Sequence, residues 1–253
     1  MKKVAAVTGS SRGIGKAVAL KLASRGYKVL LLGRPSPELS QVLCEINVEG
    51  EGEIILMDLL DSQHCATVLA GRQVDVLVNC AIYQGPGENA RFDQLDLGEY
   101  TKLYTGNVLS QVALIQSVLP HMLSSTCCSI FQLVSSSTRI QPTRAVDKGG
   151  FQAFGYVSTK SAISKLVPLL KLEHESSPSQ IRFFNLDPGL VITDKMVREG
   201  TAPRFIKYGA TKPEDTAEVI AFLATASSDH TLVKQSSGAE FVYAPTLLTM
   251  AKM

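Results

Sequence analysis

The amino-acid sequence predicts an α/β protein, a doubly wound fold with a seven-stranded parallel sheet and helices on both faces. Short apolar runs rich in β-branched residues and bounded by Gly, Pro, Asp or Ser are typical of buried strands. Longer stretches with apolar residues at helical spacing separate these runs, and an uninterrupted alternation of strand and helix favours a parallel sheet. The 253 residues contain no repeat, low-complexity tract or linker, so we expect a single domain over residues 1–253.

The strands and helices are expected in strict succession along the chain. The predicted strands cover residues 4–7, 29–32, 54–57, 74–78, 129–134, 181–186 and 240–243. The predicted helices cover residues 14–24, 62–70, 99–123, 156–174 and 213–226. Pro168 falls inside the helix over 156–174, where a proline costs about 3 kcal/mol or kinks the helix unless it is accommodated.

The composition excludes several classes of partner. Lys and Arg total 25 and Asp and Glu total 23, which gives a net charge of +2 without a long block of one sign. This balance argues against binding to nucleic acid or to an anionic membrane. No apolar stretch approaches the roughly 18 residues needed to span a bilayer.

Cysteine and histidine usage predicts a reduced protein without a metal site. The cysteines are odd in number, lack Cys-x-x-Cys spacing and indicate an intracellular protein; they are Cys44, Cys65, Cys80, Cys127 and Cys128. The four histidines are scattered along the chain, so we predict no metal site. The apolar run that starts at Val4 leaves no room for a signal peptide, and we expect a cytoplasmic location. The terminal Ala251-Lys252-Met253 is a conservative variant of the Ser-Lys-Leu peroxisomal address, which leaves the peroxisome as the alternative.

A glycine-rich turn follows the first predicted strand and leads directly into a helix. Residues 8–15 read Thr-Gly-Ser-Ser-Arg-Gly-Ile-Gly. Unpaired backbone N–H groups and the helix dipole make such a turn a site for an anion. The spacing Thr-Gly-x-x-x-Gly-x-Gly resembles the cofactor motif of the short-chain dehydrogenase/reductase family, whose fold is Rossmann-like. This resemblance implies cofactor contacts from Thr8, Gly9, Ser11, Arg12, Gly13, Ile14 and Gly15.

The end of the second strand indicates which dinucleotide binds. A fold that prefers NAD places an acidic residue here to bind the ribose 2′-OH, about 20 residues beyond the glycines. The sequence has Leu32-Gly33-Arg34 instead, and Arg34 and Arg12 could both pair with a 2′-phosphate. We therefore predict NADP(H). Asp58 and Leu59 resemble the family's adenine-binding pair, although Asp58 could instead be a helix N-cap.

A tyrosine and a lysine four residues apart begin the helix predicted after the fifth strand. Tyr156 and Lys160 share one helical face, so the ammonium group is expected to lower the pKa of the phenol and make it a usable acid or base. This Tyr-x-x-x-Lys pattern resembles the catalytic motif of the same family. The resemblance assigns Ser136, with Ser135 and Ser137 as neighbouring candidates, to the serine that binds the substrate oxygen. It assigns Asn107 to the asparagine whose local helix distortion holds a water linking Lys160 to solvent.

Two further segments complete the resemblance, which spans almost the whole chain. After the sixth strand, the family's Pro-Gly-x-x-x-Thr segment holds the nicotinamide carboxamide, which implies contacts from Pro188, Gly189, Ile192 and Thr193. After the fourth strand, the family's Asn-Asn-Ala-Gly is replaced by Asn79, Cys80, Ala81 and Ile82. The isoleucine in place of glycine narrows the space beside the cofactor.

The resemblance implies an NADPH-dependent carbonyl reductase acting on a small-molecule ketone, aldehyde or secondary alcohol. Two alternatives remain, a 3-oxoacyl carrier-protein reductase and a dinucleotide-binding protein without chemistry. The helices over 99–123 and 156–174 are apolar on more than one face, so we expect a homodimer or homotetramer. Residues 139–154 are expected to form a mobile flap on the substrate side.

Overall fold

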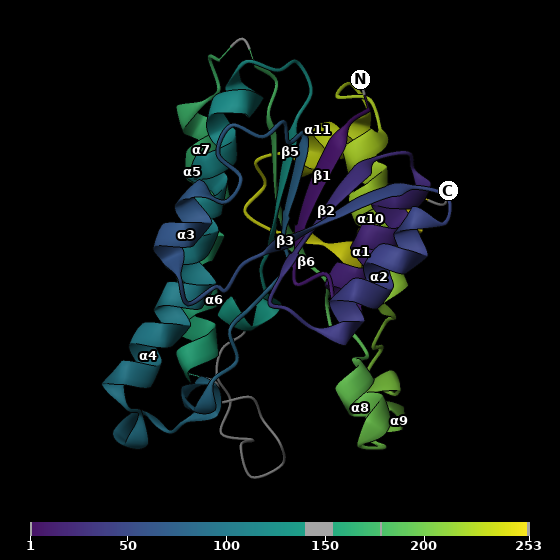
Figure 1. Cartoon of the computed structure of the whole chain (residues 1–253). Coiled ribbons are helices and arrows are strands. Elements are labelled where there is room, and N and C mark those ends of the chain that lie inside the picture. The colour runs from purple at the N-terminus through teal and green to yellow at the C-terminus, as the bar shows by residue number, and fades with distance from the viewer. Residues whose placement is uncertain (1, 140–153, 178, 252–253) are drawn as a thin grey trace.

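The computed structural model describes residues 2–139, 154–177 and 179–251, and the predicted fold class is confirmed. Within these residues, seven parallel strands form one sheet in the order β3-β2-β1-β4-β5-β6-β7. The order reverses direction between β1 and β4, which is where ligands bind in sheets of this type. Figure 1 shows the sheet between two groups of helices.

The strands occupy nearly the predicted positions. They are β1 (Val4–Thr8), β2 (Lys28–Gly33), β3 (Glu51–Leu56), β4 (Val76–Asn79), β5 (Ser129–Leu133), β6 (Arg182–Asp187) and β7 (Val242–Tyr243). The long helices are α1 (Gly13–Ser24), α2 (Pro37–Asn47), α4 (Leu97–Tyr104), α5 (Ser110–Leu123), α6 (Phe154–Ser164), α7 (Leu166–Glu173), α10 (Pro213–Thr225) and α12 (Ala244–Ala251). The short helices are α3 (Ser62–Thr67), α8 (Asp194–Arg198), α9 (Ala202–Ile206), α11 (Thr231–Ser236), η1 (Pro86–Asn89), η2 (Phe92–Gln94), η3 (Thr105–Leu109) and η4 (Ser136–Thr138).

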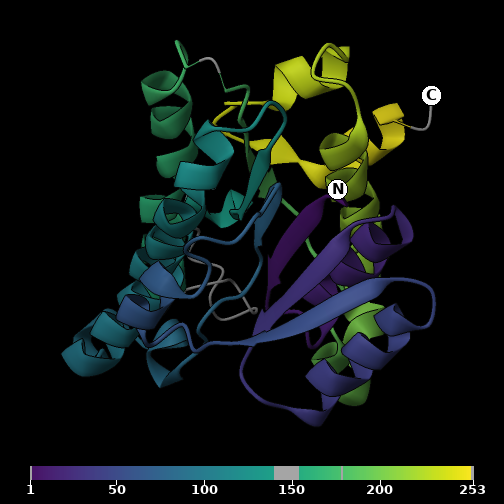
Figure 2. The ribbon, with the colours of Figure 1, turned by 45° about the horizontal axis from the view of Figure 1, so that its top comes forward.

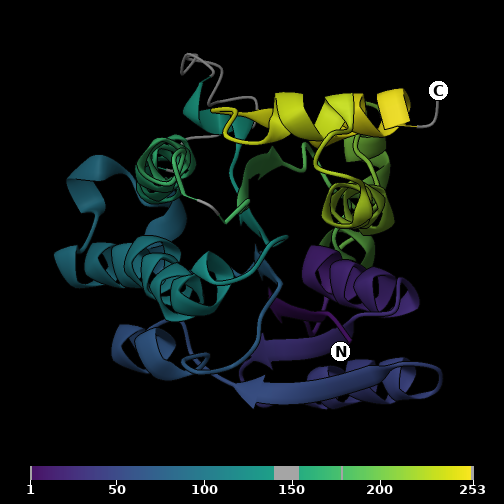
Figure 3. The ribbon, with the colours of Figure 1, turned by 90° about the horizontal axis from the view of Figure 1, so that it is seen from above.

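Apolar side chains alternate between the two faces of the sheet and build one core on each face. In β2, Val29 and Leu31 belong to one core, whereas Leu30 and Leu32 belong to the other. The first core is completed by α1, α2, α10 and α12, and the second by α3, α5 and α7. Figures 2 and 3 show the two layers of helices from different sides. Burial on both faces explains why the strands are continuous apolar runs.

The predicted helix over 156–174 is broken into two helices next to Pro168. Helix α6 ends at Ser164, and Pro168 lies in the first turn of α7, where a backbone N–H has no helical partner in any case. The Ser164 carbonyl, which Pro168 cannot bond, accepts a 2.6 Å hydrogen bond from Asn185 Nδ2. The proline is therefore accommodated by a break, and a neighbouring strand supplies the missing donor.

The predicted helix over 99–123 is also interrupted. A π-helical turn, η3, separates α4 from α5 and contains Asn107. π-helical turns are frequent at functional sites because they re-aim the residues that they contain. This turn is the local distortion that the family resemblance implied.

The strands end on the side of the molecule from which α8 and α9 project (Figure 1). The turns after β1, β4, β5 and β6 meet at this edge, so it holds the predicted site residues. Two predictions concern residues that lie outside the described ranges. One is the flap, for residues 140–153, and the other is the terminal tripeptide, for Lys252 and Met253. In the described part of the chain, no helix has the length and apolar character that crossing a membrane requires.

Candidate active site

The glycine-rich turn requires glycine at three positions, for lack of space or because of a left-handed backbone conformation. A Cβ on Gly15 would lie 2.2 Å from the carbonyl oxygen of Gly9, and Gly9 and Gly13 have φ values of +70° and +54°. Arg12 is the N-cap of α1, and its side chain does not bond the first turn. The N-terminus of α1 therefore offers backbone N–H groups that no cap side chain blocks.

Thr8 ties this turn to the segment after β4. Its Oγ1 accepts hydrogen bonds from the backbone N–H groups of Cys80 and Ala81, at 3.0 and 2.9 Å. A Cβ on Gly9 would lie 3.1 Å from the Cα of Ala81, so the two segments are in close contact. Asn79 points inward, where its Nδ2 donates to Gln132 Oε1 at 3.2 Å. The structure thus brings the predicted residues after β1 and β4 together.

The two arginines predicted to select the cofactor are exposed near the ends of β1 and β2. Arg12 and Arg34 are absent from the ion pairs found among the described residues. Glu38, in the first turn of α2, is a nearby carboxylate that sequence reasoning did not weigh. Hydrogen bonds with its own backbone and with Ser36 lower the pKa of Glu38, and the charge of Arg12 contributes further.

Asp58 is not the N-cap of the helix that follows it. Its Oδ1 accepts a 3.0 Å hydrogen bond from the backbone N–H of Leu60, within a local turn. The N-cap of α3 is Asp61, whose Oδ1 accepts from the N–H of His64 at 2.9 Å. The alternative interpretation of Asp58 as a helix cap is therefore wrong. Leu59 joins the site to helix α5, because its carbonyl accepts a 2.6 Å hydrogen bond from Ser110 Oγ.

Lys160 is buried one helical turn after Tyr156. The lysine is 3 % exposed, and its Nζ lies 5.9 Å from the centre of the Tyr156 ring and donates to the Leu133 carbonyl at 2.7 Å. Burial lowers the pKa of Lys160 to about 8, although the charge of Asp187 opposes this shift. Cys80 stays a neutral thiol, because burial raises its pKa to about 12.

The expected lowering of the Tyr156 pKa is not found in this structure. Burial raises the pKa of the phenol, the hydrogen bond with Ser135 lowers it, and the carboxylate charges of Asp187 and Glu88 raise it further. The ammonium group of Lys160 donates to the Leu133 carbonyl. In this arrangement the tyrosine is held protonated, as a proton donor must be.

The serine that contacts the tyrosine is Ser135, whereas the sequence-based choice was Ser136. Ser135 shares the hydrogen bond with Tyr156, and its Oγ also lies 2.9 Å from Ser137 Oγ. Ser136 is turned to Asp187: its backbone N–H donates to Asp187 Oδ2 at 2.9 Å, and its side chain bonds the same carboxylate. The 3-10 turn η4 begins at Ser136, so these two consecutive serines have different side-chain partners.

Asp187 joins two of the predicted segments. While Oδ2 accepts from Ser136, Oδ1 accepts from the N–H of Gly189 at 2.9 Å. Gly189 has a φ of +72°, and a Cβ there would lie 3.0 Å from the ring of Tyr243. Pro188 and Gly189 are thereby fixed next to the serine turn. Sequence reasoning missed Asp187, although it directly precedes the Pro-Gly pair.

The remaining residues of the Pro-Gly segment lead away from the sheet. The N–H of Ile192 donates to the Thr211 carbonyl at 2.9 Å, and the hydroxyl of Thr193 accepts from the N–H of Met196 at 3.3 Å. Thr193 is exposed at the start of α8. Its hydroxyl therefore stabilises the turn into α8.

Asn107 holds the chain next to Ile82. It is fully buried, its Oδ1 accepts from the N–H of Tyr83 at 2.6 Å, and its Nδ2 donates to the Tyr83 carbonyl at 3.1 Å. Together with the bonds from Thr8, this pair fixes the segment on both sides of Ile82. The isoleucine that replaces the usual glycine thus leaves the anchoring of this segment intact.

Comparisons with known proteins agree with this geometry. A family model described as short chain dehydrogenase matches residues 3–204. A short chain dehydrogenase of Emericella nidulans is 27% identical over 245 residues, covering 88% of this chain and 87% of the relative. An uncharacterised oxidoreductase of Staphylococcus epidermidis is 26% identical over 203 residues, covering 79% of this chain and 82% of the relative.

Solved structures give the same result. A 3-oxoacyl (acyl-carrier-protein) reductase from Agrobacterium tumefaciens with NADP bound has a TM-score of 0.79 and 25% identity, covering 95% of this chain and 92% of its own. A putative NAD(P) dependent gluconate 5-dehydrogenase from Beutenbergia cavernae, with bound NADP at low occupancy, also has a TM-score of 0.79, with 26% identity and coverage of 96% and 94%. With this sequence match and this fold, the chain belongs to the short chain dehydrogenase family and is an oxidoreductase.

Proposed function

We propose that this protein is an NADP(H)-dependent carbonyl reductase that interconverts a ketone or aldehyde and the corresponding alcohol. The observation that carries the proposal is the contact between Tyr156 and Ser135, with Lys160 buried one turn further along the same helix. A protonated phenol beside a second hydroxyl donor can bind and protonate one substrate oxygen.

The residues of the glycine-rich turn fit a dinucleotide. Gly15 could not carry a Cβ without a clash, and the uncapped N-terminus of α1 suits a pyrophosphate. Arg12 and Arg34 suit a 2′-phosphate, since guanidinium groups pair well with phosphate oxygens. The NADP bound to the two related structures supports the same choice. We further assign Asp58 and Leu59 to the adenine end, and Pro188, Gly189, Ile192 and Thr193 to the nicotinamide end.

The bound nicotinamide would supply or accept the hydride. Tyr156 would donate its proton to the substrate oxygen during reduction, while Ser135 orients that oxygen by a hydrogen bond. Lys160, with a pKa of about 8, can carry the positive charge that stabilises the tyrosinate left behind. We assign Asn107 to positioning, because its amide fixes the main chain at Tyr83. The proposed tetrad is thus Asn107, Ser135, Tyr156 and Lys160, with Ser135 in place of Ser136.

The first test is a turnover assay with a panel of carbonyl compounds. We expect oxidation of NADPH with at least one ketone, diketone or acyl thioester, and none with Tyr156→Phe in the same assay. Activity restricted to acyl thioesters would favour a 3-oxoacyl carrier-protein reductase, the activity named for one structural relative. Tight NADPH binding without turnover of any substrate would favour the non-catalytic alternative.

We also propose that the chain forms a homodimer or homotetramer. Helix α7 exposes Leu169 and Leu172 at 61 % and 69 %, η3 exposes Leu109, and α5 exposes Leu123. Exposed leucines that gather on long helices at one side of a sheet are typical of a covered face in the assembled protein. A second copy of the same chain is the partner we expect for this face.

A further inference from the structure

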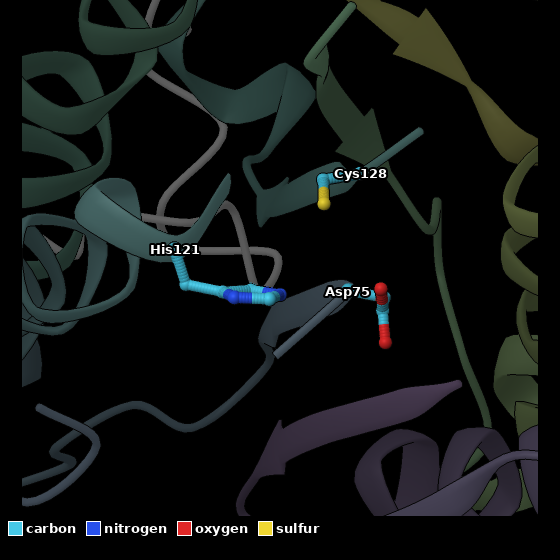
Figure 4. Close-up of side chains that lie close together, drawn as sticks. All are labelled: Asp75, His121 and Cys128. Atoms are coloured by element: carbon cyan, nitrogen blue, oxygen red, sulfur yellow. The ribbon is translucent and has the colours of Figure 1, made fainter. Parts of the chain in front are cut away.

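Three side chains of the kind that bind metal ions lie close together at the edge of the sheet where the parallel strands begin. This edge is opposite the proposed active site. Asp75 directly precedes β4, Cys128 directly precedes β5, and His121 lies in the last turn of α5. One ligand atom from each residue lies within 4.8 Å of the other two. Figure 4 shows the three side chains close together.

The cluster is enclosed by the fold. Asp75 is 8 % exposed and Cys128 is 1 % exposed, whereas His121 is half-buried and leaves a side open to solvent. Asp75 Oδ2 accepts a 2.7 Å hydrogen bond from the backbone N–H of Val4, and none of the ion pairs found in the described part of the chain involves Asp75. A buried carboxylate without a positive partner is costly unless a cation compensates its charge.

We propose that Asp75, His121 and Cys128 form a binding site for a divalent transition-metal ion of the zinc type. A thiolate, an imidazole and a carboxylate are the ligands that Zn²⁺ takes, whereas Mg²⁺ and Ca²⁺ take oxygen atoms. The charges balance, because one thiolate and one carboxylate neutralise the ion in a buried place. Asp75 Oδ1, Cys128 Sγ and a ring nitrogen of His121 are the ligand atoms, with water completing a tetrahedral site.

Binding requires a small contraction and the release of one proton. Zinc–ligand bonds of about 2.0 to 2.3 Å place tetrahedral ligand atoms roughly 3.3 to 3.7 Å apart, so atoms now within 4.8 Å must approach by about 1 Å. Rotation of the His121 side chain can bring its ring closer, because the 3.2 Å interaction between Nε2 and the hydroxyl of Ser125 can be exchanged for a metal bond, and small shifts of Asp75 and Cys128 supply the rest. The S–H bond of Cys128 breaks, its proton passes to solvent, and the metal–sulfur bond forms with no change in oxidation state.

The position of the site predicts a structural effect. A metal ion here would connect the start of β4 to the end of α5 and the start of β5, which lie much further along the chain. Because the tyrosine and the glycine-rich turn lie at the other edge of the sheet, we expect the ion to change thermal stability and to leave turnover unaffected. A ligand that binds only the folded state raises the free energy of unfolding.

Titration of the chelator-treated full-length protein with Co²⁺ tests the proposal directly. We expect one equivalent to bind with a thiolate-to-cobalt charge-transfer band and the strong visible bands of tetrahedral cobalt. Competition with a chromophoric chelator then measures the Zn²⁺ affinity. Zn²⁺ should raise the Tm of the wild-type protein, and the raised Tm should return to its starting value on addition of a strong chelator.

Variants separate this site from other thiols. Cys127→Ser is the matched control, since Cys127 adjoins Cys128 but is not one of the three clustered residues. We expect Cys127→Ser to bind like the wild type, whereas Cys128→Ser and His121→Ala bind at least a hundredfold more weakly. Wild-type protein without the charge-transfer band, or Cys128→Ser protein with the wild-type spectrum and affinity, would overturn the proposal. If Cys128→Ser does not fold, the metal affinity of His121→Ala and the cobalt spectrum of the wild type still test the proposed site, because His121 is only half-buried.

Discussion

The carboxylate of Asp187 holds the backbone N–H of Ser136 in a 2.9 Å hydrogen bond, and this contact fixes the direction of the serine turn. Because the Ser136 side chain is engaged by the same carboxylate, the hydroxyl that faces Tyr156 comes from Ser135. A buried aspartate at the end of β6 therefore orients a serine that follows β5. Three consecutive serines are chemically equivalent in sequence, and only this contact distinguishes them.

Ser135→Ala is expected to lower kcat by about 100-fold or more, because a hydrogen bond to the reacting oxygen is lost. Ser136→Ala is the matched control and should stay within a few-fold of wild type, since the backbone bond to Asp187 survives. Steady-state kinetics with the best carbonyl substrate measures both. A larger loss in Ser136→Ala than in Ser135→Ala would restore the sequence-based assignment.

Tyr156→Phe should abolish turnover and leave NADPH affinity within a few-fold of wild type. The substitution removes the proton donor and keeps the ring, so binding and chemistry separate. Single-turnover kinetics and NADPH fluorescence titration measure the two effects. A variant that retains a tenth of the wild-type kcat would contradict the role of Tyr156.

Lys160→Met should stabilise the cofactor-free protein at pH 7 by roughly 1 to 3 kcal/mol while it inactivates the enzyme. The folded-state pKa of about 8 lies below the unfolded value near 10.4, so the native state binds fewer protons between these values. The free energy of unfolding of the wild type therefore rises with pH between these two pKa values. The difference in stability between Lys160→Met and the wild type becomes smaller over the same pH range.

Urea unfolding at several pH values measures this difference. Lys165→Met is the control, because the exposed Lys165 pairs with Glu240 at the surface and should change stability by less than about 0.5 kcal/mol. A Lys160→Met protein that is less stable than wild type at pH 7 would show that the buried ammonium group is compensated.

NADPH should be preferred over NADH by at least roughly tenfold in kcat/KM, since one retained arginine–phosphate contact supplies about 1.4 kcal/mol. Arg34→Ala should remove most of this preference, whereas Arg25→Ala, at the far end of α1, should not. The double substitution Gly33→Asp with Arg34→Ile should favour NADH. It is sterically allowed, because a Cβ at Gly33 meets only the Leu39 methyl groups at 3.7 and 4.0 Å. Equal use of both cofactors by the wild type would contradict phosphate binding by either arginine.

Leu169→Asp combined with Leu172→Asp should convert an oligomer to a species near 27.2 kDa. Val48→Asp, an exposed apolar residue after α2, is the control and should leave the oligomer intact. Sedimentation at micromolar concentration distinguishes these outcomes. A wild-type protein that sediments as a monomer would rule out the proposed covered face.

The sheet was predictable because each strand is a short apolar run between turn residues. Helix α2 was not among the predicted helices, although Ser36 caps it and Pro37 opens it, because its apolar positions Leu39, Val42 and Ile46 are few. The short helices α8, α9 and α11 carry too few residues to show a period. Their positions depend on contacts with distant segments, as in the bridge between Val191 and Thr211.

The candidate site was predictable at the level of motifs, and the structure differs from the sequence-based expectation in two details. The identity of the serine and the pKa of Tyr156 both depend on where a buried carboxylate and a buried ammonium group point. Residue spacing does not predict where either side chain points, because tertiary contacts set both directions. Asp187 bonds Ser136, and Lys160 bonds the Leu133 carbonyl. The proximity of Asp75, His121 and Cys128 was likewise invisible, since β4 and β5 become neighbours only in the sheet.

The hydrogen bonds that Cys80 and Ala81 donate to Thr8 determine which substitutions the site can accept. One hydroxyl oxygen accepts hydrogen bonds from two backbone N–H groups, so serine can replace Thr8. Valine has nearly the same shape as threonine, but it would leave both N–H groups without this acceptor. Side chains in the segment after β4 remain outside this constraint, because its backbone alone is held. This explains how cysteine and isoleucine can stand at positions 80 and 82, where the Asn-Asn-Ala-Gly motif that this segment resembles has asparagine and glycine.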